Sequence, residues 1–80
     1  MYYVYVLKSP KQFYIGSTSD LRKRFLEHQS NKCKSTKDRG PWQIVYYEAS
    51  ISKKGTIHRE KYLKTAWGRR YLKTRLQKSE

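Results

Sequence analysis

The sequence predicts a small α/β (α+β) domain in which a three-stranded antiparallel sheet is flanked by helices, in the order β-β-α-β-α-α. Three short segments, 2–8, 12–17 and 42–49, are rich in the β-branched and aromatic residues that favour strands. Apolar residues at helical spacing follow the second and the third of these segments. The 80 residues leave no room for a second hydrophobic core, so we expect one domain, 1–80.

The first two strands are predicted to form a β-hairpin. Residues 2–8 are β-branched or aromatic almost throughout, which is typical of a buried strand. The turn is expected at 9–11, because Pro10 lacks the backbone N–H that a sheet ladder needs. Residues 12–17 then return as the second strand, with Gly16 close to its end.

A helix is expected directly after the hairpin. Ser19 can cap it, and Asp20 in its first turn is favourable at the positive end of the helix dipole. On a helical wheel, Leu21, Phe25 and His28 fall on one face, so this face is predicted to pack on the sheet.

A polar, basic loop is predicted at 31–41, where it ends at Gly40-Pro41 and could lie against a ligand. Residues 42–49 form the third predicted strand, and 50–55 are expected to be a basic connection.

Two helices are predicted in the last part of the chain. The first begins at Thr56, and Gly68 is expected to bend or end it before a last helix over 69–77. One stripe of the first of these helices carries Ile57, Glu60, Leu63 and Trp67.

The charge of the chain is extreme for its length. Nineteen Lys and Arg residues against six Asp and Glu residues give a formal net charge of +13. Such a charge implies a polyanionic partner, through phosphate neutralisation and counterion release. The alternative is a surface charged for solubility, which needs a net charge of only about 2–8. The eight Tyr, two Trp and two Phe residues argue against a disordered basic tail, which is poor in aromatic rings.

The single cysteine, Cys33, excludes an intramolecular disulfide and a multi-cysteine zinc site, and in its polar loop it is expected to be an incidental free thiol. No apolar signal segment follows Met1, and no run approaches the ~18 apolar residues of a membrane helix. We therefore expect a cytoplasmic protein without a membrane partner.

Four residues of the first half of the chain could form the site of a phosphodiester hydrolase. Tyr5 and Tyr14 lie on adjacent antiparallel strands and can meet on one face, either as catalytic hydroxyls or as an aromatic core pair. Arg24 and His28 are four residues apart and therefore neighbours on one helical face. Arg24 can grip a phosphate or pack its stem on the surface, and His28 can be a catalytic group or a satisfied boundary histidine.

Glu60 is the sharpest single candidate, because only six acids occur in the chain and this one shares a stripe with apolar residues. A carboxylate on an inward helix face requires a cation, which is either a metal ion or an ion-pair partner such as Arg24 or a lysine. One carboxylate completed by waters and phosphate oxygens suits Mg²⁺ and does not form a two-metal site.

Together these residues resemble the GIY-YIG nuclease superfamily, in particular its short stand-alone members related to the N-terminal nuclease domain of excinuclease. Tyr3-Val4-Tyr5 stands where the family has Gly-Ile-Tyr, and Tyr14-Ile15-Gly16 is its second motif unaltered. The family's helix arginine falls on Arg24, and its following His or Tyr position falls on His28. Its metal-binding glutamate falls on Glu60, so the resemblance covers essentially all 80 residues.

The chain departs from the family pattern at three points. Tyr3 replaces the first glycine, Ser17 stands where a basic residue is usual, and no asparagine follows Glu60. These departures bear on catalytic strength rather than on the fold. Without an appended specificity domain, target choice is expected to come from this module or from a protein partner.

The resemblance implies a DNA endonuclease or nickase that hydrolyses phosphodiester bonds with a single Mg²⁺ or Mn²⁺ on Glu60, in DNA repair or recombination. Tyr5 would act as general base or orient the attacking water, and Tyr14 would position the water or the phosphate. Arg24 would stabilise the charge that develops on the phosphoryl oxygens, and His28 would hydrogen-bond a tyrosine hydroxyl or the phosphate.

Basic residues of three segments are expected to hold the nucleic-acid backbone without reading bases. The expected partner is DNA, with RNA as a second possibility, and the chain is expected to be a monomer or a weak dimer. These basic residues are Lys32, Lys34, Lys37, Arg39, Lys53, Lys54, Arg69, Arg70 and Lys73.

Two other functions remain open. The fold could serve only as a basic nucleic-acid-binding module, or it could belong to an accessory protein that binds RNA or a ribonucleoprotein. The missing asparagine favours the binding module, whereas the intact set of Tyr5, Tyr14, Arg24 and Glu60 favours the nuclease.

Overall fold

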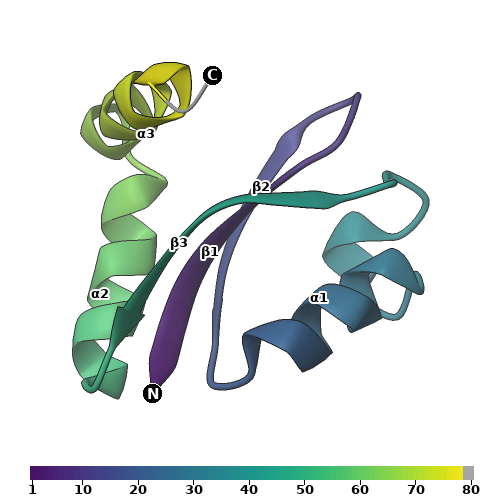
Figure 1. The fold of residues 1–80 in the computed structure, drawn as a ribbon, viewed down its shortest axis with the longest axis horizontal. Coiled ribbons are helices and arrows are strands. Elements are labelled where there is room, and N and C mark those ends of the chain that lie inside the picture. Colours follow the sequence, from purple (N-terminus) through teal and green to yellow (C-terminus); the bar gives the residue numbers. More distant parts are fainter. Residues whose placement is uncertain (79–80) are drawn as a thin grey trace.

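The computed structural model describes residues 1–78, and its elements follow the predicted order β-β-α-β-α-α (Figure 1). One short 3₁₀ helix, which the sequence did not predict, is added in the loop after the first helix. The elements are β1 (Tyr2–Lys8), β2 (Phe13–Thr18), α1 (Leu21–Gln29), η1 (Lys34–Thr36), β3 (Gln43–Ser50), α2 (Lys53–Leu63) and α3 (Ala66–Lys78). Among the described residues no helix is long and apolar enough to cross a membrane.

The three strands form one antiparallel sheet with β1 in the centre, in the order β2-β1-β3. The predicted sheet is therefore confirmed. Figure 1 shows α1 on one side of this sheet and α2 and α3 on the other. Because side chains alternate along a strand, β1 supplies two separate cores, one for each side.

The core on the α1 side holds Tyr5 and Leu7 of β1 with Trp42, and Leu21 and Phe25 of α1 pack against it. The predicted apolar face of the first helix is thus the face that meets the sheet. The core on the other side is built from Val4 and Val6 of β1 with Leu63 of α2 and Leu72 of α3.

The hairpin turn between β1 and β2 is closed by Ser9, which is buried. Its backbone N–H donates to the carbonyl oxygen of Gln12, and its Oγ accepts from the backbone N–H groups of Lys11 and Gln12. These bonds satisfy the backbone of a turn in which Pro10 has no N–H to donate.

Two predicted helix starts were wrong. α1 is capped by Asp20 and not by Ser19, because the Asp20 Oδ1 accepts from the backbone N–H of Lys23 at 3.1 Å. α2 begins at Lys53, three residues before the predicted start at Thr56, because Ser52 caps it and accepts from the N–H of Gly55. Most of the stretch 50–55 is therefore cap and first helical turn rather than a connection.

The break between the last two helices lies at 64–65, before Gly68, which sits in the first turn of α3. A Cβ on Gly68 would lie 2.1 Å from the carbonyl oxygen of Tyr62 and 2.4 Å from the Cα of Leu63. The glycine is therefore needed for the close approach of α3 to the end of α2. The predicted stripe also fails at its end, since Trp67 is 68% exposed.

Candidate active site

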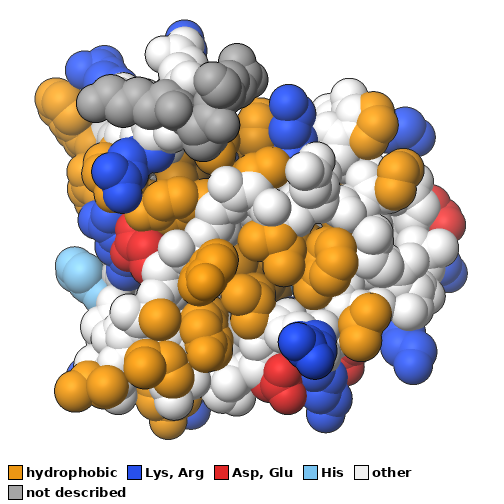
Figure 2. All heavy atoms as spheres, viewed as in Figure 1, with side chains coloured by type: hydrophobic (Ala, Val, Ile, Leu, Met, Phe, Trp, Pro, Cys, Tyr) orange, Lys and Arg blue, Asp and Glu red, His pale blue; other side chains and the backbone are white. Residues whose placement is uncertain are grey.

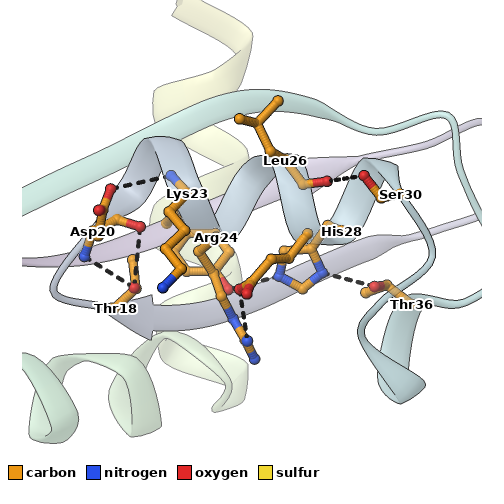
Figure 3. Close-up of polar contacts among 10 residues, drawn as sticks. Thr18, Asp20, Lys23, Arg24, Leu26, His28, Ser30 and Thr36 are labelled. Atoms are coloured by element: carbon orange, nitrogen blue, oxygen red, sulfur yellow. Dashed lines mark hydrogen bonds and ion pairs between the residues drawn. The ribbon is translucent and has the colours of Figure 1, made fainter.

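A buried chain of three polar side chains lies between the sheet and α1 (Figure 3). The Tyr5 hydroxyl is 2.8 Å from Nε2 of His28, and Nδ1 of His28 is 2.7 Å from Oγ1 of Thr36. The three residues come from β1, α1 and η1, and their relative exposures are 1%, 0% and 0%. Both ring nitrogens of His28 thus have a partner in a site closed to solvent, so the ring is fixed in orientation.

Burial fixes the protonation states in this chain. Desolvation, followed by the positive charge of Arg24, lowers the pKa of His28, so its imidazole is neutral at pH 7. Desolvation raises the pKa of Tyr5 to about 12, although hydrogen bonding to Arg24 opposes this rise. The Tyr5 hydroxyl therefore keeps its proton at neutral pH.

Tyr14 joins the same cluster through its ring. Its ring centroid lies 4.9 Å from that of His28, 6.3 Å from that of Tyr5 and 6.4 Å from that of Trp42. The predicted meeting of the two motif tyrosines on one face is therefore what the structure shows. Trp42 closes the cluster and donates from Nε1 to the Thr36 carbonyl oxygen at 3.4 Å.

The glycine of the second motif is required by the tyrosine of the first. Gly16 is paired with Tyr5 across the β1–β2 ladder. A Cβ on Gly16 would lie 2.6 Å from the Tyr5 hydroxyl oxygen and 3.0 Å from the ring of Tyr14. No side chain larger than hydrogen fits there unless the tyrosines move.

Arg24 lies at the border of this cluster, as the sequence predicted. Its Nη1 pairs with Oε1 of Glu27 at 3.3 Å, and hydrogen bonding to Tyr5 raises the pKa of its guanidinium. The side chain is about two-fifths exposed. Arg24 therefore holds a positive charge between the buried Tyr5 hydroxyl and the solvent, where an anion could reach it.

Glu60 lies on α2, on the opposite side of the sheet from His28. Its Oε1 accepts from Oγ of Ser17 at 2.5 Å, and its Oε2 accepts from Nζ of Lys64 at 2.7 Å. Burial acts to raise the pKa of this carboxyl, but the bonds from Lys64 and Ser17 outweigh it and the pKa is lowered. Of the two ion-pair partners that the sequence suggested, the lysine is present and Arg24 is not.

Two consecutive residues of the edge strand β2 connect the two halves of the site. Gly16 faces Tyr5 on the α1 side, and Ser17 points to the other side, where it binds Glu60. The Tyr5–His28 pair and Glu60 are thus placed on either side of the same two residues at one edge of the sheet.

The donor set at Glu60 fits a hydrated divalent cation. No group of three or more His, Cys, Asp or Glu side chains that could enclose a metal occurs within residues 1–78. A single half-buried carboxylate leaves most ligand positions to waters and substrate oxygens, as Mg²⁺ prefers. Lys64 stands where such a cation would bind and would have to move aside.

Three contacts of the site were not predicted. Thr36 and Trp42 reach the cluster only because the loop after α1 folds back under the sheet, and nothing in the local sequence pattern marks that path. Lys64 could have been found, since it follows Glu60 by four residues, the spacing at which a glutamate and a lysine pair on a helix. Cys33, predicted to lie in a polar loop, is a free thiol that is 7% exposed, so it is buried.

The predicted nucleic-acid-binding residues are all exposed, but they form three separate groups. One follows α1, one forms the first turn of α2, and one lies on α3, so the groups are distributed over both sides of the sheet (Figure 1). The guanidinium of Arg70 lies 5.0 Å from the ring of the exposed Trp67. The groups are Lys32, Lys34, Lys37 and Arg39; Lys53 and Lys54; and Arg69, Arg70 and Lys73.

Known proteins share this sequence and this fold. A model of the GIY-YIG catalytic domain matches residues 1–74. A UPF0213 protein of Clostridium perfringens is 42% identical over 67 residues, which cover 80% of this chain and 71% of that protein. A UPF0213 protein of Streptococcus pyogenes is 38% identical over 78 residues, which cover 95% of this chain and 78% of that protein.

A solved structure shows the same arrangement. The solution NMR structure of the UPF0213 protein BH0048 from Bacillus halodurans matches with a TM-score of 0.57 and 31% sequence identity. The match covers 91% of this chain and 82% of that one. Because the domain model spans both tyrosine motifs, Arg24, His28 and Glu60, the chain belongs to the GIY-YIG catalytic domain family.

Proposed function

We propose that this protein is a metal-dependent DNA endonuclease or nickase that hydrolyses phosphodiester bonds. The observation that carries this proposal is the buried Tyr5–His28–Thr36 chain, which holds a tyrosine hydroxyl beside the cationic Arg24. A fully buried histidine bonded to two hydroxyls is costly to build, and it orients a group that could act on a phosphate. The net charge of +13 supports a polyanionic substrate.

His28 acts in this scheme by positioning Tyr5. Because Tyr5 is protonated, its hydroxyl donates to Nε2 of the neutral imidazole, which leaves the imidazole proton on Nδ1 to be donated to Thr36. This arrangement turns an oxygen lone pair of Tyr5 away from His28. The hydroxyl can then accept a hydrogen bond from the attacking water.

With a pKa of about 12, Tyr5 is a weak base at neutral pH. It orients the water in the resting protein, and it becomes a stronger proton acceptor only when more positive charge gathers near it. Arg24 already supplies one such charge. When bound at Glu60, Mg²⁺ or Mn²⁺ would supply a second and would neutralise charge on the phosphoryl oxygens.

The remaining residues bind and stabilise the substrate. Arg24 is placed to hold a phosphoryl oxygen with the face of its guanidinium that Glu27 leaves open, so that it stabilises the charge of the transition state. Tyr14, which is half-buried beside His28, is placed to fix the phosphate or the water. The exposed lysines and arginines would hold the backbone of the DNA.

A second function is favoured by one observation. Both oxygens of Glu60 already have protein partners, Ser17 and Lys64, which is the arrangement expected of a nuclease fold used only for binding. In that case the protein would be a basic nucleic-acid-binding module.

A nicking assay separates the two functions. Supercoiled plasmid and branched DNA would be incubated with the wild type and with Glu60→Ala, in Mg²⁺, Mn²⁺ or EDTA, and binding would be measured by gel shift. Metal-dependent nicking that Glu60→Ala loses while it still binds DNA supports the nuclease. Glu27→Ala is the matched control, and DNA that is bound but uncut in every metal supports the binding module.

A further inference from the structure

The strand β3 leaves one long edge of the sheet without a partner. The order β2-β1-β3 places it at the edge, and Figure 1 shows it crossing the front of the molecule with no other element over it. Within the described residues 1–78, the backbone of Gln43–Ser50 makes no hydrogen bonds beyond its ladder with β1. Its outward N–H and C=O groups can therefore pair with another strand.

This edge is uncharged in a strongly cationic chain. The segment 40–52 contains none of the 19 Lys and Arg residues. Its one charged residue, Glu48, is neutralised by Arg59, whose Nε and Nη2 donate to the two carboxylate oxygens at 2.9 Å each. Edge strands are commonly protected by lysines that repel a second strand, and β3 lacks this protection.

The strand is also regular where it is most exposed. The register with β1 shifts only between Val6 and Leu7, which leaves Tyr46–Ser50 as an uninterrupted run. Tyr47 in this run is 57% exposed, and its ring lies 6.2 Å from that of Tyr3 on the same face of the sheet. Figure 2 shows apolar side chains gathered beside β3, with many Lys and Arg side chains toward the periphery.

We propose that two copies of this chain pair through their β3 strands, antiparallel about a two-fold axis, to form one continuous six-stranded sheet. A second copy fits because antiparallel pairing of a strand with itself is self-complementary. It also fits because residues 40–52 bring no Lys or Arg of one copy against those of the other. An acidic partner would find no unpaired positive charge in this segment.

The paired sheet has the strand order β2-β1-β3-β3-β1-β2. Both β2 edges, with Gly16 and Ser17, then lie at opposite ends of the sheet and stay accessible. Pairing along one strand buries less than the roughly 1,600 Å² of a standard interface, so the dimer is expected to dissociate in the micromolar range. The proposal is independent of whether the protein cleaves DNA.

Sedimentation velocity tests the pairing. The wild type would be examined from micromolar to millimolar concentration in about 0.15 M salt, where charges are screened beyond about 8 Å. Tyr47→Lys places two lysines near one another across the axis and is expected to weaken the dimer about tenfold or more. Trp67→Lys adds the same charge at an exposed aromatic position on α3 and should leave the dimer unchanged.

Two further measurements keep the test decisive. Ala49→Lys is a second edge variant at an exposed position, and thermal unfolding checks that each variant folds. Amide hydrogen exchange should slow within Gln43–Ser50 as the wild-type concentration rises. A monomer at every concentration overturns the proposal, as does a dimer that Trp67→Lys weakens as much as Tyr47→Lys does. A monomeric wild type whose Tyr47→Lys variant loses only DNA affinity would make this face a nucleic-acid contact instead.

Discussion

The hydroxyl of Tyr5 lies 2.8 Å from Nε2 of His28, so the tyrosine of the first motif and the histidine of the helix form one buried hydrogen-bonded unit. Thr36 completes this unit on the far side of the imidazole ring. Removal of any member leaves polar atoms without partners in a site from which water is excluded.

Thr36→Val tests the outer end of this unit with almost no change in volume. The substitution leaves Nδ1 of His28 without its partner, so the free energy of unfolding is expected to fall by about 1–3 kcal/mol. Urea denaturation measures the loss. Thr74→Val is the matched control, because the Thr74 hydroxyl is exposed and bonds only within α3. Equal effects of the two substitutions would show that the His28–Thr36 bond contributes little.

Gly16→Ala tests the fit between the two motifs. The added methyl group would lie 2.6 Å from the Tyr5 hydroxyl oxygen, so Tyr5 must move and stability is expected to fall by about 1–3 kcal/mol. Gly55→Ala is the control, since its Cβ would meet only the Ser52 side chain, at 3.2 Å, in the first turn of α2. The control should be neutral or stabilising by up to about 1 kcal/mol. A tolerated Gly16→Ala would contradict the close packing that we describe.

The sequence was sufficient for the fold because each element carries its own local signal. The β-branched and aromatic runs mark the strands, and the spacing of Leu21, Phe25 and His28 marks the buried face of α1. The predicted contact of His28 with a tyrosine hydroxyl is present, while its role in catalysis stays a prediction. Helix starts were less predictable, because Ser19 and Asp20 are both good caps and only the backbone path selects between them.

The rest of the site depends on long-range packing that local patterns do not contain. Thr36 meets His28 only because the loop after α1 turns back toward the sheet. Ser17 meets Glu60 because the pleat of β2 sends Gly16 and Ser17 to opposite sides. A helical wheel places Glu60 on an inward stripe but does not say which strand residue it will meet.

Stability should depend on alkaline pH through Tyr5. Its pKa is raised by burial from 10.0 to about 12, so the unfolded chain loses the phenolic proton before the folded protein does. Stability from this group is complete below about pH 10 and is lost as the pH rises toward 12, by on the order of 2–3 kcal/mol.

Denaturation at several pH values, with the wild type and Tyr5→Phe, isolates this effect. The pKa of Tyr46 is also raised, mainly by burial, and this second dependence is present in both proteins. The difference between the two proteins should therefore narrow above pH 10. A difference that stays constant from neutral pH to pH 12 would mean that Tyr5 titrates normally.

Lys64 should compete with a divalent cation for Glu60. Its Nζ lies 2.7 Å from Oε2, so a metal ion must displace the ammonium group or bind against its charge. Because exposed ion pairs contribute up to about 1 kcal/mol, Lys64→Met is expected to raise the affinity for Mn²⁺ by about two- to fivefold. Isothermal titration calorimetry with Mn²⁺ measures this without any requirement for cleavage.

Lys61→Met is the matched control for Lys64, because Lys61 acts on the Glu60 carboxyl through charge alone, with no hydrogen bond to it. A larger gain for Lys64→Met than for Lys61→Met indicates direct competition at the carboxylate. Equal gains would mean that only the overall charge matters. Glu60→Gln should abolish the binding, and Mn²⁺ binding that survives this change would place the metal elsewhere, whatever the two lysine variants show.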